Sequence, residues 1–161
     1  MGRPIQLKPR LLAIASRVPR GSRVADIGTD HARIPIYLLE RGVTQSVIAT
    51  EVREGPLAAA TAALARHGLG GKAELRLGDG ASCLSKDEVD CVIIAGMGGD
   101  TIAEILRADA WLLEKRLLLQ PQTHGERVLA VLPGKSSVSV TRVWENTRKY
   151  TIYEFDGDKD L

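Results

Sequence analysis

The chain has 161 residues and a mass of 17.4 kDa, and 44% of its residues are hydrophobic, which suits one globular domain. Charged residues make up 26%, close to the globular average, so composition argues against a disordered, collagen-like or coiled-coil chain. The 22 basic and 20 acidic residues leave a net charge of +2, which indicates no particular partner, and an aromatic content of 4% argues against a broad base-stacking surface.

The N-terminal segment, residues 1–22, is basic and contains a predicted helix. Apolar residues recur at helical spacing from Lys8 to Val18, and a Pro-Arg-Gly-Ser stretch follows. The segment lacks the apolar run of a signal peptide, and no stretch of about 18 apolar residues predicts a membrane span. The two cysteines have neither zinc nor disulfide spacing, which favours a reducing, cytoplasmic location.

Residues 23–155 are predicted to form five strands that alternate with helices, followed by a β-hairpin. The expected strands are 23–28, 46–51, 73–77, 90–95 and 116–120, and the expected helices are 34–41, 56–67, 101–107 and 123–131. Two alternating runs, 137–144 and 149–155, are joined by four polar residues, which is typical of a hairpin. This order predicts a single Rossmann-like α/β domain, mostly parallel, with antiparallel strands at one edge and an acidic tail at 156–161.

Acidic residues follow three successive predicted strands, and the carboxyl ends of parallel strands share one edge of a sheet. The loop after the first strand lacks the phosphate motif G-x-G-x-x-G, and its two carboxylates would repel a pyrophosphate, which disfavours a NAD-dependent oxidoreductase. Carboxylates accept hydrogen bonds from an amino group, a ribose diol and an adenine amine, so the set suits S-adenosylmethionine. The candidate residues are Asp26, Gly28, Asp30, His31, Glu51, Asp79 and Gly80.

Simpler interpretations remain open for individual members of this set. Glu51 also suits a cap for the helix that follows it, and Asp79 between two glycines suits a turn. Among the histidines only His31 lies in the candidate site. His67 is expected to interact with a helix C-terminus, and His124 is expected at the surface.

A glycine-rich segment, Gly96, Met97, Gly98 and Gly99, follows the fourth strand, and Gln120 with Pro121 ends the fifth. The three glycines would leave space for a flat substrate beside the cofactor, and Gln120 would offer it an amide. The alternatives are a flexible turn before a helix capped by Asp100 and a glutamine that only faces solvent.

Together these motifs resemble the bacterial tRNA (adenine-22-N1)-methyltransferase family, from Leu7 to Phe155. The matching segments are 26–32, 35–38, 51–52, 55–56, 78–80, 96–99 and 119–121. The resemblance implies a class I methyltransferase fold, S-adenosylmethionine as methyl donor, no metal, and N1 of an adenine in tRNA as acceptor. Family members typically continue into a helical C-terminal domain, which we do not expect in a chain that ends at Leu161, and they often have asparagine at the position of Gln122.

The resemblance also implies roles for individual residues. The cofactor-binding set is Asp26, Gly28, Asp30, His31, Glu51, Val52, Asp79, Gly80 and Gly96. The expected substrate-side set is Met97, Gly98, Gly99 and Pro121, with Lys8, Arg10 and Arg17 on tRNA phosphates unless these three form only a solvated helix face.

The expected reaction is direct attack by the lone pair of adenine N1 on the methyl group. The N1-methyl product is cationic, so a nearby carboxylate would stabilise the developing charge. Asp30 is the candidate, with His31 orienting it and Gln120 bonding the base. The competing hypotheses are a methyltransferase acting on another RNA or a small molecule, and a non-catalytic relative that binds S-adenosylmethionine or RNA.

Overall fold

The computed structural model describes residues 3–134 and 137–157. The strands in this part of the chain are β1 (Val24–Ile27), β2 (Val47–Glu51), β3 (Ala73–Leu77), β4 (Cys91–Met97), β5 (Arg116–Pro121), β6 (Val138–Glu145) and β7 (Arg148–Asp156). The helices are α1 (Pro9–Ala15), α2 (Arg33–Glu40), α3 (Glu54–Arg66), α4 (Gly99–Ala108) and α5 (Gly125–Val131), with short 3-10 helices η1 (Lys86–Glu88) and η2 (Ala110–Glu114). None of these helices has the length and apolar character needed to span a membrane.

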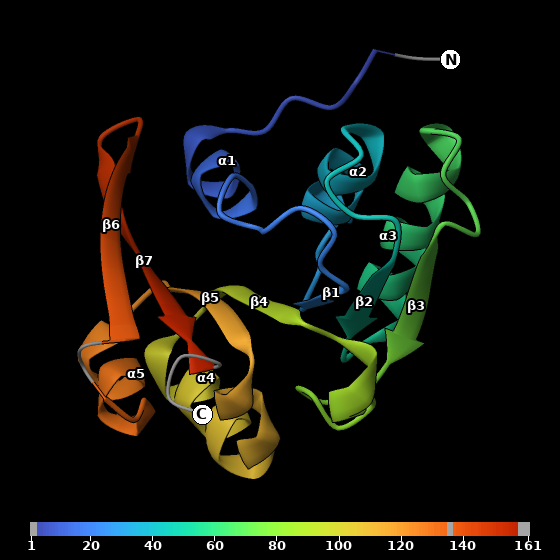
Figure 1. Ribbon diagram of the computed structural model, residues 1–161. Coiled ribbons are helices and arrows are strands. Elements are labelled where there is room, and N and C mark those ends of the chain that lie inside the picture. The colour runs from blue at the N-terminus through green and yellow to red at the C-terminus, as the bar shows by residue number, and fades with distance from the viewer. Residues whose placement is uncertain (1–2, 135–136, 158–161) are drawn as a thin grey trace.

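The strands form one sheet in the order β3-β2-β1-β4-β5-β7-β6 (Figure 1). β1 to β5 are parallel, whereas β7 pairs antiparallel with both β5 and β6. One apolar cluster contains residues of α1 and α2, and another contains residues of α4 and α5, so helices cover both faces of the sheet. The predicted Rossmann-like α/β fold with an antiparallel hairpin at one edge is confirmed.

The buried strands explain why their sequences are continuously apolar. In β4, Val92 and Ile94 belong to the cluster on the α4–α5 side, whereas Cys91 and Ile93 belong to the cluster on the α1–α2 side. Successive side chains of a strand point to opposite faces, and both faces are covered here. The sequence of such a strand is therefore apolar at every position and does not alternate between apolar and polar residues.

Most element boundaries differ from those predicted by a few residues, and two of these differences have a clear cause in the backbone. β4 does not stop at Ala95 but continues to Met97, with an irregularity of register at Gly96, whose φ is +83°. A glycine takes this conformation at little cost, which lets the strand bulge rather than end. At the other boundary, β6 and β7 stay paired as far as Glu145 and Arg148, so the hairpin turn has only two central residues, and Asn146 adopts φ +58° there.

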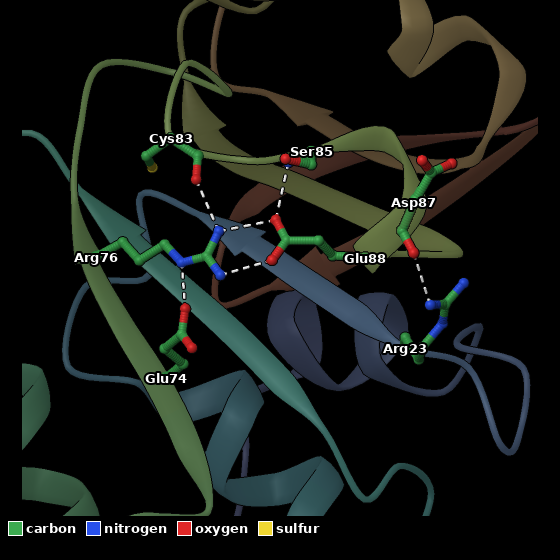
Figure 2. A network of polar contacts seen from close by, with 7 residues as sticks. All are labelled: Arg23, Glu74, Arg76, Cys83, Ser85, Asp87 and Glu88. Carbon is green, nitrogen blue, oxygen red and sulfur yellow. Dashed lines mark hydrogen bonds and ion pairs between the residues drawn. The ribbon is translucent and has the colours of Figure 1, made fainter.

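A polar network ties the edge strand β3 to the segment that precedes β4 (Figure 2). The guanidinium of Arg76 donates to both carboxylate oxygens of Glu88, at 2.8 and 2.7 Å, and to the carbonyl of Cys83 at 2.7 Å. Glu74 also accepts from Arg76, and the backbone N–H of Ser85 donates to Glu88 at 2.8 Å. These hydrogen bonds favour the ionised carboxylate and lower the pKa of Glu88 to about 2.

This network predicts a loss of stability in acid. The folded-state pKa of Glu88 lies below its ordinary value of 4.5, so its contribution is complete above pH 4.5 and is lost as pH falls toward 2. We expect the free energy of unfolding of Glu88→Gln to depend less on pH between 4.5 and 2.5 than that of the wild type, as measured by urea unfolding. The exposed residue Glu104 supplies the control, Glu104→Gln, and equal acid sensitivity in all three proteins would contradict this account.

Candidate active site

A cavity of about 480 Å³ opens at the carboxyl ends of β1, β2 and β4. Its walls come from the loop after β1, the end of β2, the glycine-rich end of β4 and the first turns of α1 and α2. The lining residues with polar or flexible side chains are Arg10, Asp26, Thr29, Asp30, Arg33, Glu51, Arg53, Met97 and Gln122. The sequence predicts that acidic residues at successive strand ends meet in one site. Those that follow β1 and β2 do line this one cavity.

The loop after β1 is held on the end of β2 by its backbone. The N–H groups of Gly28 and Thr29 donate to the carbonyl of Thr50 at 2.9 and 3.0 Å, and the N–H of Asp30 donates to a carboxylate oxygen of Glu51 at 2.6 Å. Gly28 has φ +68°, and a Cβ there would lie 2.5 Å from the end of the Met97 side chain. The positive φ therefore favours glycine here, whereas the flexible end of the Met97 side chain is able to move away from an added Cβ.

Three carboxylates of this wall differ in exposure. Asp26 is only 4% exposed, and its carboxylate accepts the hydroxyl of Thr29 at 2.8 Å. Burial raises the pKa of Asp26 to about 7, the hydrogen bond from Thr29 opposes this shift, and the charges of Glu51 and Asp30 add to it. Glu51 is also buried, whereas the side chain of Asp30 is 69% exposed at the rim. Glu51 does not cap α3, since its carboxylate is bound to the loop.

The opposite wall contains Arg10, which the sequence predicts to contact tRNA phosphates. Arg10 lines the cavity and donates to the amide oxygen of Gln120 at 2.7 Å, and its guanidinium lies 5.6 Å from the ring centre of Tyr150. Gln120 itself is fully buried, so it does not face solvent or offer its amide to a base. Gln120 is expected from the sequence to bond the base at the rim, but in the structure its amide oxygen accepts a hydrogen bond from Arg10 instead. The glutamine that lines the cavity is Gln122.

The glycine-rich segment divides into two parts. Gly96 and Met97 line the cavity, but Gly98 and Gly99 do not. Gly99 donates its N–H to the carbonyl of Thr123 at 2.7 Å, and a Cβ on Gly99 would lie 2.1 Å from the carbonyl oxygen of His124. Gly99 therefore allows α4 to pack closely against the segment before α5, and the clearing of substrate space by Gly98 and Gly99 stays a prediction.

Several other predicted site residues lie outside the cavity. Asp79 and Gly80 line a separate hollow of about 260 Å³ beside α4. The His31 ring is half exposed and lies 3.6 Å from the carboxylate of Asp30 without lining the cavity. Pro121 is buried and pairs with Met97 between β5 and β4. Val52, in contrast, lines the cavity with 59% of its surface exposed, which is unusual for an apolar side chain.

The basic residues of α1 and its flank do not form one free face. Lys8 is exposed, but Arg17 donates to the hydroxyl of Thr141 at 3.0 Å and lies 3.8 Å from a carboxylate oxygen of Glu154. Arg10 is likewise engaged with Gln120, as described above. Two of the three cations predicted to contact phosphates therefore fasten α1 to the sheet.

A larger hollow, of about 980 Å³, lies at the amino ends of β2 and β3. Its acidic residues are Glu74 and Glu88, and both are bound to Arg76. Both carboxylates are thus ion-paired with a cation, whereas Asp26 and Glu51 in the smaller cavity accept hydrogen bonds from uncharged groups. The chemistry of the carboxylates singles out the smaller cavity.

The chain is similar to a known family and to solved structures. A family described as "Methyltransferase domain" matches residues 7–153. The tRNA (adenine(22)-N(1))-methyltransferase of Bacillus subtilis (strain 168) is 38% identical over 126 residues, which cover 77% of this chain and 53% of that protein. The structure of the B. subtilis M1A22 tRNA methyltransferase TrmK matches with a TM-score of 0.86 and 34% identity, covering 96% of this chain and 68% of that one. M. capricolum TrmK in complex with S-adenosyl-homocysteine matches with a TM-score of 0.78 and 26% identity, covering 97% and 70%.

The fold, the acidic cavity and these matches define a methyltransferase domain. Within that class, the chain belongs to the bacterial tRNA (adenine-22-N1)-methyltransferase family, as the motifs predicted. The chain spans about half the length of the curated relative that it matches.

Proposed function

We propose that the chain is an S-adenosylmethionine-dependent methyltransferase whose acceptor is N1 of an adenine in tRNA. The observation that carries the proposal is the meeting of Asp26, Asp30 and Glu51 in one cavity at the ends of β1 and β2. The names of the matched relatives support the acceptor, and the bound S-adenosyl-homocysteine of M. capricolum TrmK supports the cofactor. A tRNA acceptor would place the protein in the cytoplasm.

The lining of the cavity fits an adenosyl cofactor with a cationic amino-acid part. Glu51 would accept from the ribose hydroxyls, because only one of its carboxylate oxygens is bound to the backbone of the loop. Asp26 would hold the amino group, and the exposed Val52 offers apolar surface to the adenine ring. When bound, S-adenosylmethionine supplies the methyl group that is transferred.

The remaining roles belong to residues at the rim. Adenine N1 lies on the Watson–Crick edge, so the base must leave any pair or stack before it can react. The exposed carboxylate of Asp30 would stabilise the cation that forms on the methylated base, with His31 orienting that carboxylate. Gln120 would act through Arg10, whose guanidinium it fixes at the cavity. Positioning of the base against the methyl group would supply most of the rate.

The raised pKa of Asp26 predicts a pH dependence of cofactor binding. Below about pH 7 the buried carboxyl is protonated and attracts a cationic amino group poorly, and above pH 7 it is ionised. We expect the affinity for S-adenosylmethionine to rise by up to about tenfold between pH 6 and pH 8. The affinity is measured by calorimetry on the wild type and on Asp26→Asn. Ionisation of the ligand affects both proteins equally, so a difference between their pH profiles comes from Asp26. The same pH profile in the two proteins would contradict the assignment.

The acceptor is tested with an unmodified tRNA transcript and S-adenosylmethionine carrying a labelled methyl group. We expect one methyl group per transcript, mapped to N1 of adenine 22, and no transfer to a transcript with guanine at that position. Methylation at another atom or of another RNA would support the broader methyltransferase hypothesis instead. Tight cofactor binding with no transfer to any RNA would support a non-catalytic relative.

A further inference from the structure

The tip of the β6–β7 hairpin, residues 142–151, carries an exposed aromatic residue among cations. Trp144 is 62% exposed, the largest exposed fraction of any large hydrophobic side chain in the described part of the chain. Lys149 is its direct cross-strand partner, with the ammonium 5.8 Å from the centre of the indole ring. Arg142 lies two residues before Trp144 and so shares its face of the hairpin. This face of the tip is therefore both aromatic and basic.

The positive charge of the tip is free, whereas the acids of the hairpin are engaged. Among residues 3–134 and 137–157, neither Arg142, Arg148 nor Lys149 forms an ion pair. Glu145 accepts the backbone N–H of Arg10 at 3.0 Å. At the base of the hairpin, Glu154 is paired with arginines. Arg142 and Lys149 are thus available to an anionic partner.

The tip is continuous with the rim of the active-site cavity. The guanidinium of Arg148 donates to the backbone carbonyl of Gln122 at 3.1 Å, and Gln122 lines the cavity. The ring of Tyr150 lies 5.0 Å from the guanidinium of Arg148 and 5.6 Å from that of Arg10, which also lines the cavity. In Figure 1 the turn of the hairpin stands beside α1, the element that carries Arg10.

We propose that the hairpin tip binds the tRNA strand that flanks the reacting adenine. Trp144 stacks on an unpaired base, and Arg142 and Lys149 contact phosphates. The inference rests on the proposed function, because the reacting base must be unstacked and its neighbours are then accessible to an aromatic side chain. Aromatic rings combined with cations are the usual means of holding single-stranded RNA. An aromatic content of 4% argues against a broad base-stacking surface but is compatible with a single stacking residue.

The free positive charge favours RNA over a protein segment as the occupant. Val140 is 44% exposed on the same face as Trp144, so a protein segment is the competing occupant. An apolar segment would leave the two cations of this face, Arg142 and Lys149, without partners, whereas RNA supplies a phosphate for each of them. Charge complementarity therefore selects RNA.

The charges are tested with the double variant Arg142→Gln/Lys149→Gln and a matched control, Arg66→Gln/Lys72→Gln, at the opposite edge of the sheet. We expect the hairpin variant to bind unmodified tRNA about tenfold more weakly in 0.1 M salt. The slope of log affinity against log salt should also become shallower by about 1.4, or 0.7 for each lost phosphate contact. S-adenosylmethionine affinity should stay at the wild-type value in both variants. Equal tRNA affinity in the hairpin and control variants would overturn the proposal.

Stacking is tested separately at Trp144. We expect Trp144→Ala to raise the Kd for tRNA about tenfold, and Trp144→Phe to retain most of the affinity, because a phenyl ring still stacks. Unchanged tRNA affinity in Trp144→Ala, with or without a change in melting temperature, would overturn the stacking role and favour a protein occupant. If the wild type binds S-adenosylmethionine but neither binds nor methylates tRNA, the proposed function itself fails, and the hairpin proposal fails with it.

Discussion

Replacing Glu51 with glutamine is expected to weaken S-adenosylmethionine binding about 100-fold, or about 2.7 kcal/mol. One oxygen of the Glu51 carboxylate accepts a hydrogen bond from the N–H of Asp30 at 2.6 Å, and the other is available to a ribose hydroxyl. Hydrogen bonds to a charged acceptor are each worth about 1.5–3 kcal/mol, and the amide removes that charge from both. Because the amide has nearly the same shape, the loop should keep its conformation and the protein should remain folded.

Calorimetric titration with S-adenosylmethionine measures this loss directly. The matched control is Glu54→Gln, which removes the same charge from an exposed position in the first turn of α3, three residues further along the chain. We expect the control to bind like the wild type. Equal affinities for Glu51→Gln and Glu54→Gln would exclude Glu51 from the cofactor site.

Replacing Gly99 with alanine is expected to lower the free energy of unfolding by about 3 kcal/mol. The added Cβ would lie 2.1 Å from the carbonyl oxygen of His124 and 2.6 Å from that of Thr123. Both atoms belong to the backbone, so they cannot rotate away, and separating the segments stretches the hydrogen bond from Gly99 to Thr123. For a chain of this size the melting temperature should fall by about 6–12 °C.

Gly98→Ala is the control for this substitution. A Cβ there would lie 3.2 Å from the hydroxyl of Thr123, a side chain that is able to rotate, so we expect a loss below about 1 kcal/mol. Thermal unfolding of the two variants therefore separates packing from substrate clearance. If both variants keep the wild-type melting temperature and lose only methyl transfer, the segment clears substrate space, as the sequence first suggested.

The order of strands and helices was predictable because each element carries a strong local pattern. Continuous apolar runs mark β4 and β5, and alternation marks β6 and β7. The continuation of β4 through Gly96 was not predictable, since a bulge depends on the register with β5 rather than on periodicity.

The site was predictable to the extent that it lies at strand ends. Asp26 and Glu51 follow that rule and meet in the cavity. Asp79 obeys the same rule and yet lines a separate hollow, because the rule assigns residues to an edge and gives no distance along it. Arg10 reaches the site through the packing of α1 beside β6 and its bond to Gln120, a contact between residues 110 positions apart. No local pattern encodes such a contact.

A crystal structure of the chain with S-adenosyl-homocysteine would locate the cofactor site directly. We expect electron density for the ligand in the 480 Å³ cavity, with the ribose hydroxyls on Glu51 and the amino group beside Asp26. Density in the 980 Å³ hollow at the amino ends of β2 and β3, or a ligand in the cavity that touches neither carboxylate, would contradict it.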